Sequence, residues 1–223
     1  MISLKEELQD FTFSENDVSL LTSKFEELAP YFLSGGYLQV RDEYRIYPTT
    51  IEFYFHSENG GIQDLIVYHR NKRMVDEGIE LPYFPLMSLH AHDSGYDITF
   101  ENKDKKYRAS ALIRAYQVWD ITKQQWIKWD AKLQKFRYYS AFEDSTPINT
   151  QVLYLKTFLN SFNMESNDIV WVDSSSLLEV NNGIKTGTLR KGVDMYDKQG
   201  IRQKGVPDKR PWSFSREKFI EIP

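Results

Sequence analysis

The residues best suited to chemistry lie on a short segment whose side chains alternate in character. The alternating residues are Ile51, Glu52, Phe53, Tyr54, Phe55 and His56. Because successive side chains of a β-strand point to opposite faces, Glu52, Tyr54 and His56 would project together. A carboxylate, a phenol and an imidazole on one face could form an acid–base site with an aromatic wall. An amphipathic strand with a solvated polar face has the same pattern.

His90 and His92 form a second candidate site. On a strand the two imidazoles point to the same side, and such a pair is a common half-site for a divalent metal. A metal-dependent enzyme is therefore one hypothesis, and two surface histidines near a turn are the alternative interpretation. A closed site needs further ligands, for which His69 and Asp93 are the only nearby candidates. We expect no metal and no other cofactor.

Two segments combine basic residues with groups that suit nucleic acid. Residues 126–139 interleave lysines and an arginine with the aromatic residues Trp126, Trp129, Phe136, Tyr138 and Tyr139. Aromatic rings stack on bases and cations neutralise phosphates, although lysine stems that cover a core give the same pattern. Residues 185–218 are basic and rich in glycine, so that backbone amides and cations there could hold phosphate.

These side chains need a sheet to position them, and strand patterns dominate the middle of the chain. Strands are predicted at residues 51–56, 96–100 and 111–119, and a short buried strand at residues 169–172. The glycine- and proline-containing stretch 181–211 is predicted to form loops with short strands.

Helix signals are fewer. Capping residues at 14–17 precede apolar residues at helical spacing, which predicts a helix that ends before Pro30. A second helix of about three turns is predicted over residues 152–162. The fold class is therefore α+β: one domain over residues 1–223, with a mostly antiparallel curved sheet, a few peripheral helices and an N-terminal helical segment (residues 1–30) packed on it.

The composition limits the classes of protein to which this chain can belong. The 223 residues are 41% hydrophobic and 15% aromatic, which excludes a disordered chain, and the absence of cysteine excludes disulfides and thiolate catalysis. No apolar run approaches the ~20 residues of a membrane helix, and the first residues do not have the pattern of a signal peptide. We expect a cytoplasmic monomer. The net charge of −4 argues against a strongly basic nucleic-acid binder but permits a local basic face.

The order of several short motifs resembles the alkyladenine (3-methyladenine, methylpurine) DNA glycosylase family. Residues 49–54 resemble its E-T-E-A-Y strand, and residues 112–115 resemble its L-L-R-A strand at the matching distance from Gly95, the glycine of its Y-G-M segment. Further similarity follows in the same order along residues 40–216, at residues 68–71, 153–172, 190–193 and 210–214. The resemblance implies a methylpurine-glycosylase-like fold and a metal-free, monofunctional hydrolysis of the N-glycosidic bond of an extruded alkylated or deaminated purine.

The resemblance also assigns roles by position. Glu52 would activate the attacking water, and Tyr54 would stack on the base. Further substrate contacts would come from His69 and Arg114, with His90 and His92 at the pocket mouth. Contacts with nucleic acid are expected from the basic C-terminal part of the chain, at Lys185, Arg190, Lys191 and Arg210.

This sequence also departs from the family pattern. The wedge tyrosine of the family is Ser94 here, and two pocket positions are Ala91 and Glu101. Because a wedge offsets part of the cost of unpairing a base, we expect a preference for single-stranded DNA or already unpaired bases. A non-catalytic relative that binds a nucleotide or small ligand in the same pocket is the alternative function.

Overall fold

A computed structural model places the chain in an α+β fold built on an antiparallel sheet. It describes residues 3–9, 11–12, 16–64, 82–92, 95–130, 132–133, 135–139, 155, 158–160, 168–174, 183–190, 192–196, 202–217 and 220. The helices are α1 (Leu4–Gln9) and α2 (Val18–Ser34). The first strands are β1 (Gly36–Val40), β2 (Tyr44–Ser57), β3 (Leu89–His92), β4 (Gly95–Thr99), β5 (Tyr107–Asp120), β6 (Gln125–Asp130) and β7 (Lys135–Tyr139). The others are β8 (Ile169–Asp173), β9 (Ile184–Thr188), β10 (Asp194–Tyr196), β11 (Arg202–Pro207) and β12 (Ser213–Arg216).

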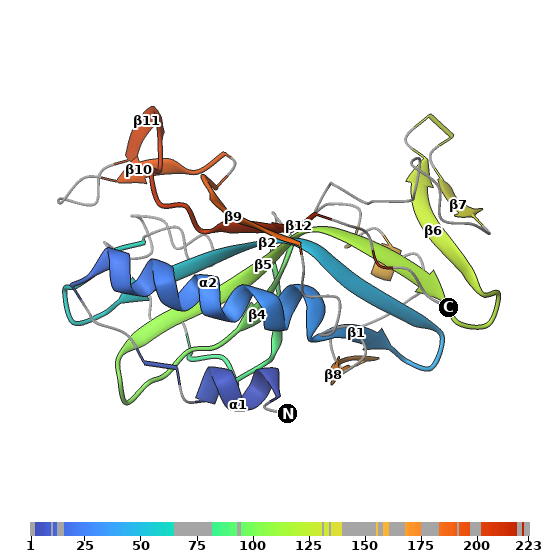
Figure 1. Cartoon of the computed structure of the whole chain (residues 1–223), viewed down its shortest axis with the longest axis horizontal. Coiled ribbons are helices and arrows are strands. Elements are labelled where there is room, and N and C mark those ends of the chain that lie inside the picture. Colours follow the sequence, from blue (N-terminus) through green and yellow to red (C-terminus); the bar gives the residue numbers. More distant parts are fainter. Residues whose placement is uncertain are drawn as a thin grey trace.

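The main sheet runs in the order β3-β4-β5-β2-β1-β8, and β5 also pairs with β6, which pairs with β7. Strand β12 lies between β2 and β9, while β10 and β11 form a separate ribbon. The two ribbons, β6–β7 and β10–β11, extend from opposite ends of the sheet (Figure 1). The α+β class and the curled antiparallel sheet predicted from the sequence are confirmed.

Helix α2 packs on one face of the sheet, which we call the inner face (Figure 1). Its Phe25 ring stacks on Phe53 of β2, with 4.4 Å between the ring centroids. Ile51 and Phe55 join the same core, as does Ile113 of β5. The predicted alternation along residues 51–56 is therefore confirmed, because its apolar side forms the centre of the fold.

The predicted end of this helix before Pro30 is wrong. Asp17 caps the N-terminus as expected, but the helix continues through Pro30 to Ser34. Proline removes one helix hydrogen bond, at a cost of about 3 kcal/mol. Phe32 and Leu33 in the following turn are fully buried, and each contributes roughly 1.5–3 kcal/mol on burial. Tertiary packing thus offsets the local cost.

Two β-bulges interrupt the ladder between β2 and β5. The register shifts twice, so that Thr49 on β2 and Arg114 on β5 have no direct partner across it. The extra residue on each strand reverses the face to which the following side chains of that strand point. Arg45 before the bulges and Glu52 after them therefore both lie on the outer face, opposite α2.

Other predicted elements are confirmed only in part. Strand β8 exists, but the prediction that it is buried is wrong: it pairs with β1 at one edge, and Val170 is 56% exposed. Within the predicted helix 152–162 the structure describes Leu155 and residues 158–160, which are helical. None of the helices among the described residues is both long and apolar enough to cross a membrane.

Candidate functional site

Glu52 lies at the centre of the outer face. The register places it between Leu112 of β5 and Ser213 of β12. Its residue exposure is 1%, so the alternative interpretation of a solvated polar face is wrong. A buried carboxylate requires partners that compensate for its lost hydration.

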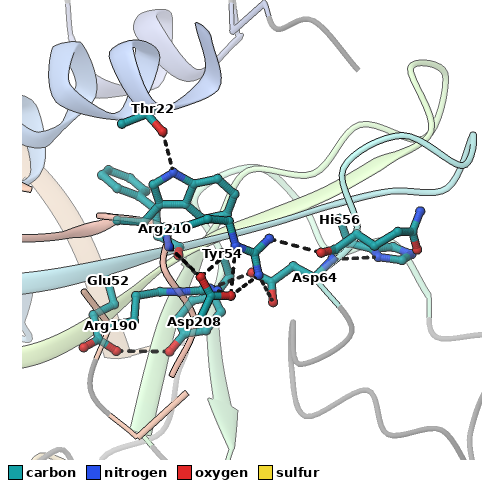
Figure 2. Close-up of polar contacts among 11 residues, drawn as sticks. Thr22, Glu52, Tyr54, His56, Asp64, Arg190, Asp208 and Arg210 are labelled. Atoms are coloured by element: carbon teal, nitrogen blue, oxygen red, sulfur yellow. Dashed lines mark hydrogen bonds and ion pairs between the residues drawn. The ribbon is translucent and has the colours of Figure 1, made fainter. Parts of the chain in front are cut away.

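Tyr54 supplies the first of these partners. Its hydroxyl donates a hydrogen bond of 3.1 Å to Glu52 Oε2 (Figure 2). Burial, and then the negative charge of Glu52, raises the pKa of Tyr54 well above its usual value of 10.0. The phenol therefore stays protonated and remains a donor to Glu52 throughout the neutral range.

Arg114 supplies the second partner. Its Nε lies 3.5 Å from Glu52 Oε1, and its side chain is 28% exposed. Arg114 is the residue that the bulge on β5 leaves without a partner in the ladder. Bulges commonly redirect a side chain next to a functional site. Here the bulge lets a cation reach from the buried carboxylate to solvent.

Glu52 belongs to a row of residues that crosses six strands. Paired in register, the members of the row are His90, Asp97, Leu112, Glu52, Ser213 and Thr188. Side chains directly opposite in antiparallel strands lie on the same face. The structure therefore places His90 and Glu52, two of the residues predicted to form the site, on the same face, with three gaps of about 4.8 Å between strands, or roughly 14 Å, separating them.

Asp97 is a site residue that the sequence interpretation missed. It is buried, it lies opposite His90, and its charge contributes to the raised pKa of Tyr54. The alternation over residues 96–100 contains the signal, because Tyr96, Ile98 and Phe100 are apolar and Asp97 falls on the other face. Asp97 gives the outer face a second buried carboxylate.

The structure describes the predicted site histidines to different extents. His90 is half-buried, and its ring lies 4.3 Å from that of Phe84, centroid to centroid. The backbone of His92 lies in β3, opposite Gly95, but its side chain is outside the described residues, as is the whole of His69. No group of three or more metal-binding side chains occurs in the described part of the chain.

Arg190 corrects a prediction, because it is not a surface residue that could contact nucleic acid. Its guanidinium is fully buried and forms ion pairs of 2.6 Å with Asp64 and 2.9 Å with Asp208 (Figure 2). It also donates to the backbone oxygen of Phe53 and lies over the Tyr54 ring. Burial acts to lower the pKa of Arg190, but the attraction of Asp64 and its other partners outweighs burial and raises the pKa. Arg190 therefore packs against Tyr54, which is the hydrogen-bond partner of Glu52.

Arg210 forms ion pairs within the same network. It is ion-paired with Asp208, its Nη2 lies 3.5 Å from Asp64, and its guanidinium lies over Trp212. Trp212 in turn donates to Thr22 of α2, which links the network to the helix (Figure 2). Burial acts to raise the pKa of Asp208, but the hydrogen bonds and charges of Arg210 and Arg190 outweigh it and lower the pKa.

The remaining predicted nucleic-acid contacts are lysines. Lys185 is exposed on β9, as a surface contact requires, and its contact with nucleic acid stays a prediction. Lys191 lies outside the described residues. The basic C-terminal segment therefore offers less free positive charge than its composition suggests.

The chain has no significant match among family models, curated proteins or solved structures. Its function must therefore be argued from the site. The resemblance to the methylpurine glycosylases stays a prediction.

Proposed function

We propose that the chain is a hydrolase that cleaves the N-glycosidic bond of an alkylated or deaminated purine in DNA, with Glu52 as the general base. The observation that supports this proposal is the buried carboxylate of Glu52, held between the Tyr54 hydroxyl and the Arg114 guanidinium. A catalytic carboxylate acts from a fixed position, and exclusion of bulk water strengthens the electrostatic interactions around it. The two contacts of Glu52 and its burial support this role.

The proposed reaction assigns a task to each group. Glu52 accepts a proton from water while the water oxygen forms a bond to the sugar carbon and the bond to the base nitrogen breaks. Arg114 stabilises the negative charge of Glu52 before the proton moves, and Tyr54 holds the carboxylate in place. An alkylated, cationic base leaves as a neutral molecule, whereas a deaminated base needs a proton. His90, opposite Asp97 in the same row, is a donor for that proton.

A base-release assay tests the proposal. Oligonucleotides containing hypoxanthine or an N-alkylated purine are incubated with the protein as single and double strands, and the free base is measured. The wild type should release base, preferentially from single strands. Glu52→Gln should lower the rate by roughly 10²–10⁴-fold, because an amide cannot accept the proton, with an unchanged melting temperature. Equal rates for both proteins would contradict the role of Glu52.

Ligand binding without catalysis is a second candidate function, and one observation favours it. Both carboxylate oxygens of Glu52 already have partners, in Tyr54 and Arg114. A protein that binds the purine nucleotide but releases no base from any oligonucleotide would support this alternative. Isothermal titration with purine nucleotides distinguishes it from the hydrolase.

A further inference from the structure

A second row of residues crosses the outer face at the other end of the sheet. It runs through β8, β1, β2, β5, β6 and β7, and its members are Val170, Gln39, Arg45, Trp119, Trp126 and Tyr139. Five gaps of about 4.8 Å between strands give the row a length of about 24 Å. It contains none of the residues assigned to the Glu52 site.

This row lies on the face of the sheet opposite α2, where buried Ile220 clusters with Tyr47 and Trp126. The neighbouring residues that point the other way, Ile46, Val118 and Ile127, belong to the core under α2. Val170 is exposed at one end of the row, and Trp119 and Tyr139 are half-buried near the other end. Solvent therefore reaches aromatic side chains that the fold does not need in its main core.

The aromatic rings of the row pack against one another. Trp126 is buried between its neighbours and packs edge-on against Trp119, with 5.0 Å between the ring centroids. Tyr47 contacts Trp126 from the adjacent position on β2 and in turn contacts Tyr37. Trp119 and Tyr139, which are half-buried, therefore both pack against the cluster that contains buried Trp126.

Positive charge borders the aromatic rings. Lys128 and Arg137 are paired across β6 and β7. They lie two residues along each strand from Trp126 and Tyr139, and therefore on the same face. At the other end, the Arg45 guanidinium lies 5.0 Å from the centre of the Tyr37 ring. Asp130 is the carboxylate of the ribbon, and the backbone amides of the adjoining turn and Arg137 hydrogen-bond to it. The ribbon is therefore a basic region on a chain of net charge −4.

We propose that this row binds single-stranded nucleic acid, with bases stacked on Trp119 and Tyr139 and phosphates bound by Lys128 and Arg137. Partly exposed rings on the face of a sheet fit unpaired bases, because every base has a face that can stack. A duplex hides those faces and would use only the cations. The row crosses β2 at Arg45, seven positions along the strand from Glu52, and this inference does not rest on the proposed hydrolysis.

The first test measures the phosphate contacts. Fluorescence anisotropy follows the binding of a labelled, undamaged single-stranded oligonucleotide between about 50 and 200 mM salt. The double variant Lys128→Ala/Arg137→Ala should bind more weakly and reduce the slope of log K against log salt by about 1.4, the value for two lost contacts to a single strand. The matched control Lys5→Ala/Lys103→Ala removes the same charge from exposed positions on α1 and on the turn before β5. Equal losses in both double variants would overturn the proposal.

The second test measures stacking. Trp119→Leu should weaken binding by roughly 5- to 100-fold, whereas Trp119→Phe, which keeps an aromatic face, should restore most of the affinity. Part of the tryptophan fluorescence quenching on binding should disappear in both variants. Equal affinity of the two variants, or equal binding of a polyphosphate that has no bases, would overturn the proposal. Because the oligonucleotide is undamaged and no base release is measured, failure of the hydrolase proposal leaves this result interpretable.

Discussion

At the scale of single residues, Arg190 shows that the number of charges in a segment does not tell how many of them reach the surface. The segment around it is basic, yet Arg190 is fully buried between Asp64 and Asp208. Removing one partner of a buried ion pair leaves an uncompensated charge. In the fold, the guanidinium therefore serves to hold together segments that are distant in sequence.

Replacing Arg190 should be strongly destabilising. Arg190→Met leaves two buried aspartates to share the single cation of Arg210, and should cost about 3–5 kcal/mol. For a chain of this length, each kcal/mol lowers the melting temperature by roughly 2–4 °C. Differential scanning calorimetry measures the change.

A surface ion pair provides the control for Arg190. Arg202 is paired with Asp194 on the β10–β11 ribbon, where its side chain is 59% exposed. Exposed pairs contribute about 0–1 kcal/mol, so Arg202→Met should melt close to the wild type. Similar losses in the two variants would contradict the structural role of Arg190.

At the scale of elements, α2 depends on its N-terminal cap. The carboxylate of Asp17 accepts hydrogen bonds from the backbone amides of Ser19 and Leu20, at 2.9 and 3.0 Å. These amides have no partner within the helix. The helix covers the inner face directly behind the strand that bears Glu52, so its stability affects the site.

Asp17→Ala should lower the free energy of unfolding by about 0.5–2 kcal/mol, because two amides lose their acceptor. Chemical denaturation followed by far-ultraviolet circular dichroism measures the loss. Asp42→Ala is the matched control, since Asp42 is exposed in the turn between β1 and β2 and should change stability by no more than about 0.5 kcal/mol. The expectation fails if Asp42→Ala is as destabilising as Asp17→Ala.

At the scale of the whole molecule, buried tyrosines should limit stability in alkali. Burial is the largest cause that raises the pKa of Tyr44 and of Tyr107, each to about 12, and the pKa of Tyr54 also lies well above 10.0. A raised pKa means that the folded state binds the proton more tightly than the unfolded state. This stabilisation is fully present below pH 10 and is lost as the pH rises towards 12.

Alkaline titration checks this expectation through tyrosinate absorbance and circular dichroism. The buried tyrosines should ionise only as the fold is lost. In urea, all 14 tyrosines should ionise together near pH 10. A single step near pH 10 with an unchanged circular dichroism spectrum would contradict the burial of these phenols.

The sequence alone determined which side of each central strand forms the core. Strict alternation over residues 51–56 placed Phe53 in the core and Glu52 opposite it, because the side-chain period of a strand is fixed by backbone geometry. The alternation over residues 96–100 likewise places Asp97 of β4 on the face opposite the core. Local capping residues at 14–17 also indicated where α2 begins, and the structure shows that Asp17 is the cap.

Only the tertiary structure decided which residues meet. Nothing in the residue types around Thr49 and Arg114 indicates a bulge, because a bulge depends on how two strands pair, and it is the bulge that directs Arg114 to Glu52. Asp64 and Arg190 are 126 positions apart, so their ion pair has no local signature. Long-range packing also explains why α2 continues past Pro30 and why Arg45, Trp119 and Tyr139 align in one row. Each depends on long-range packing that outweighs or supplements local preference.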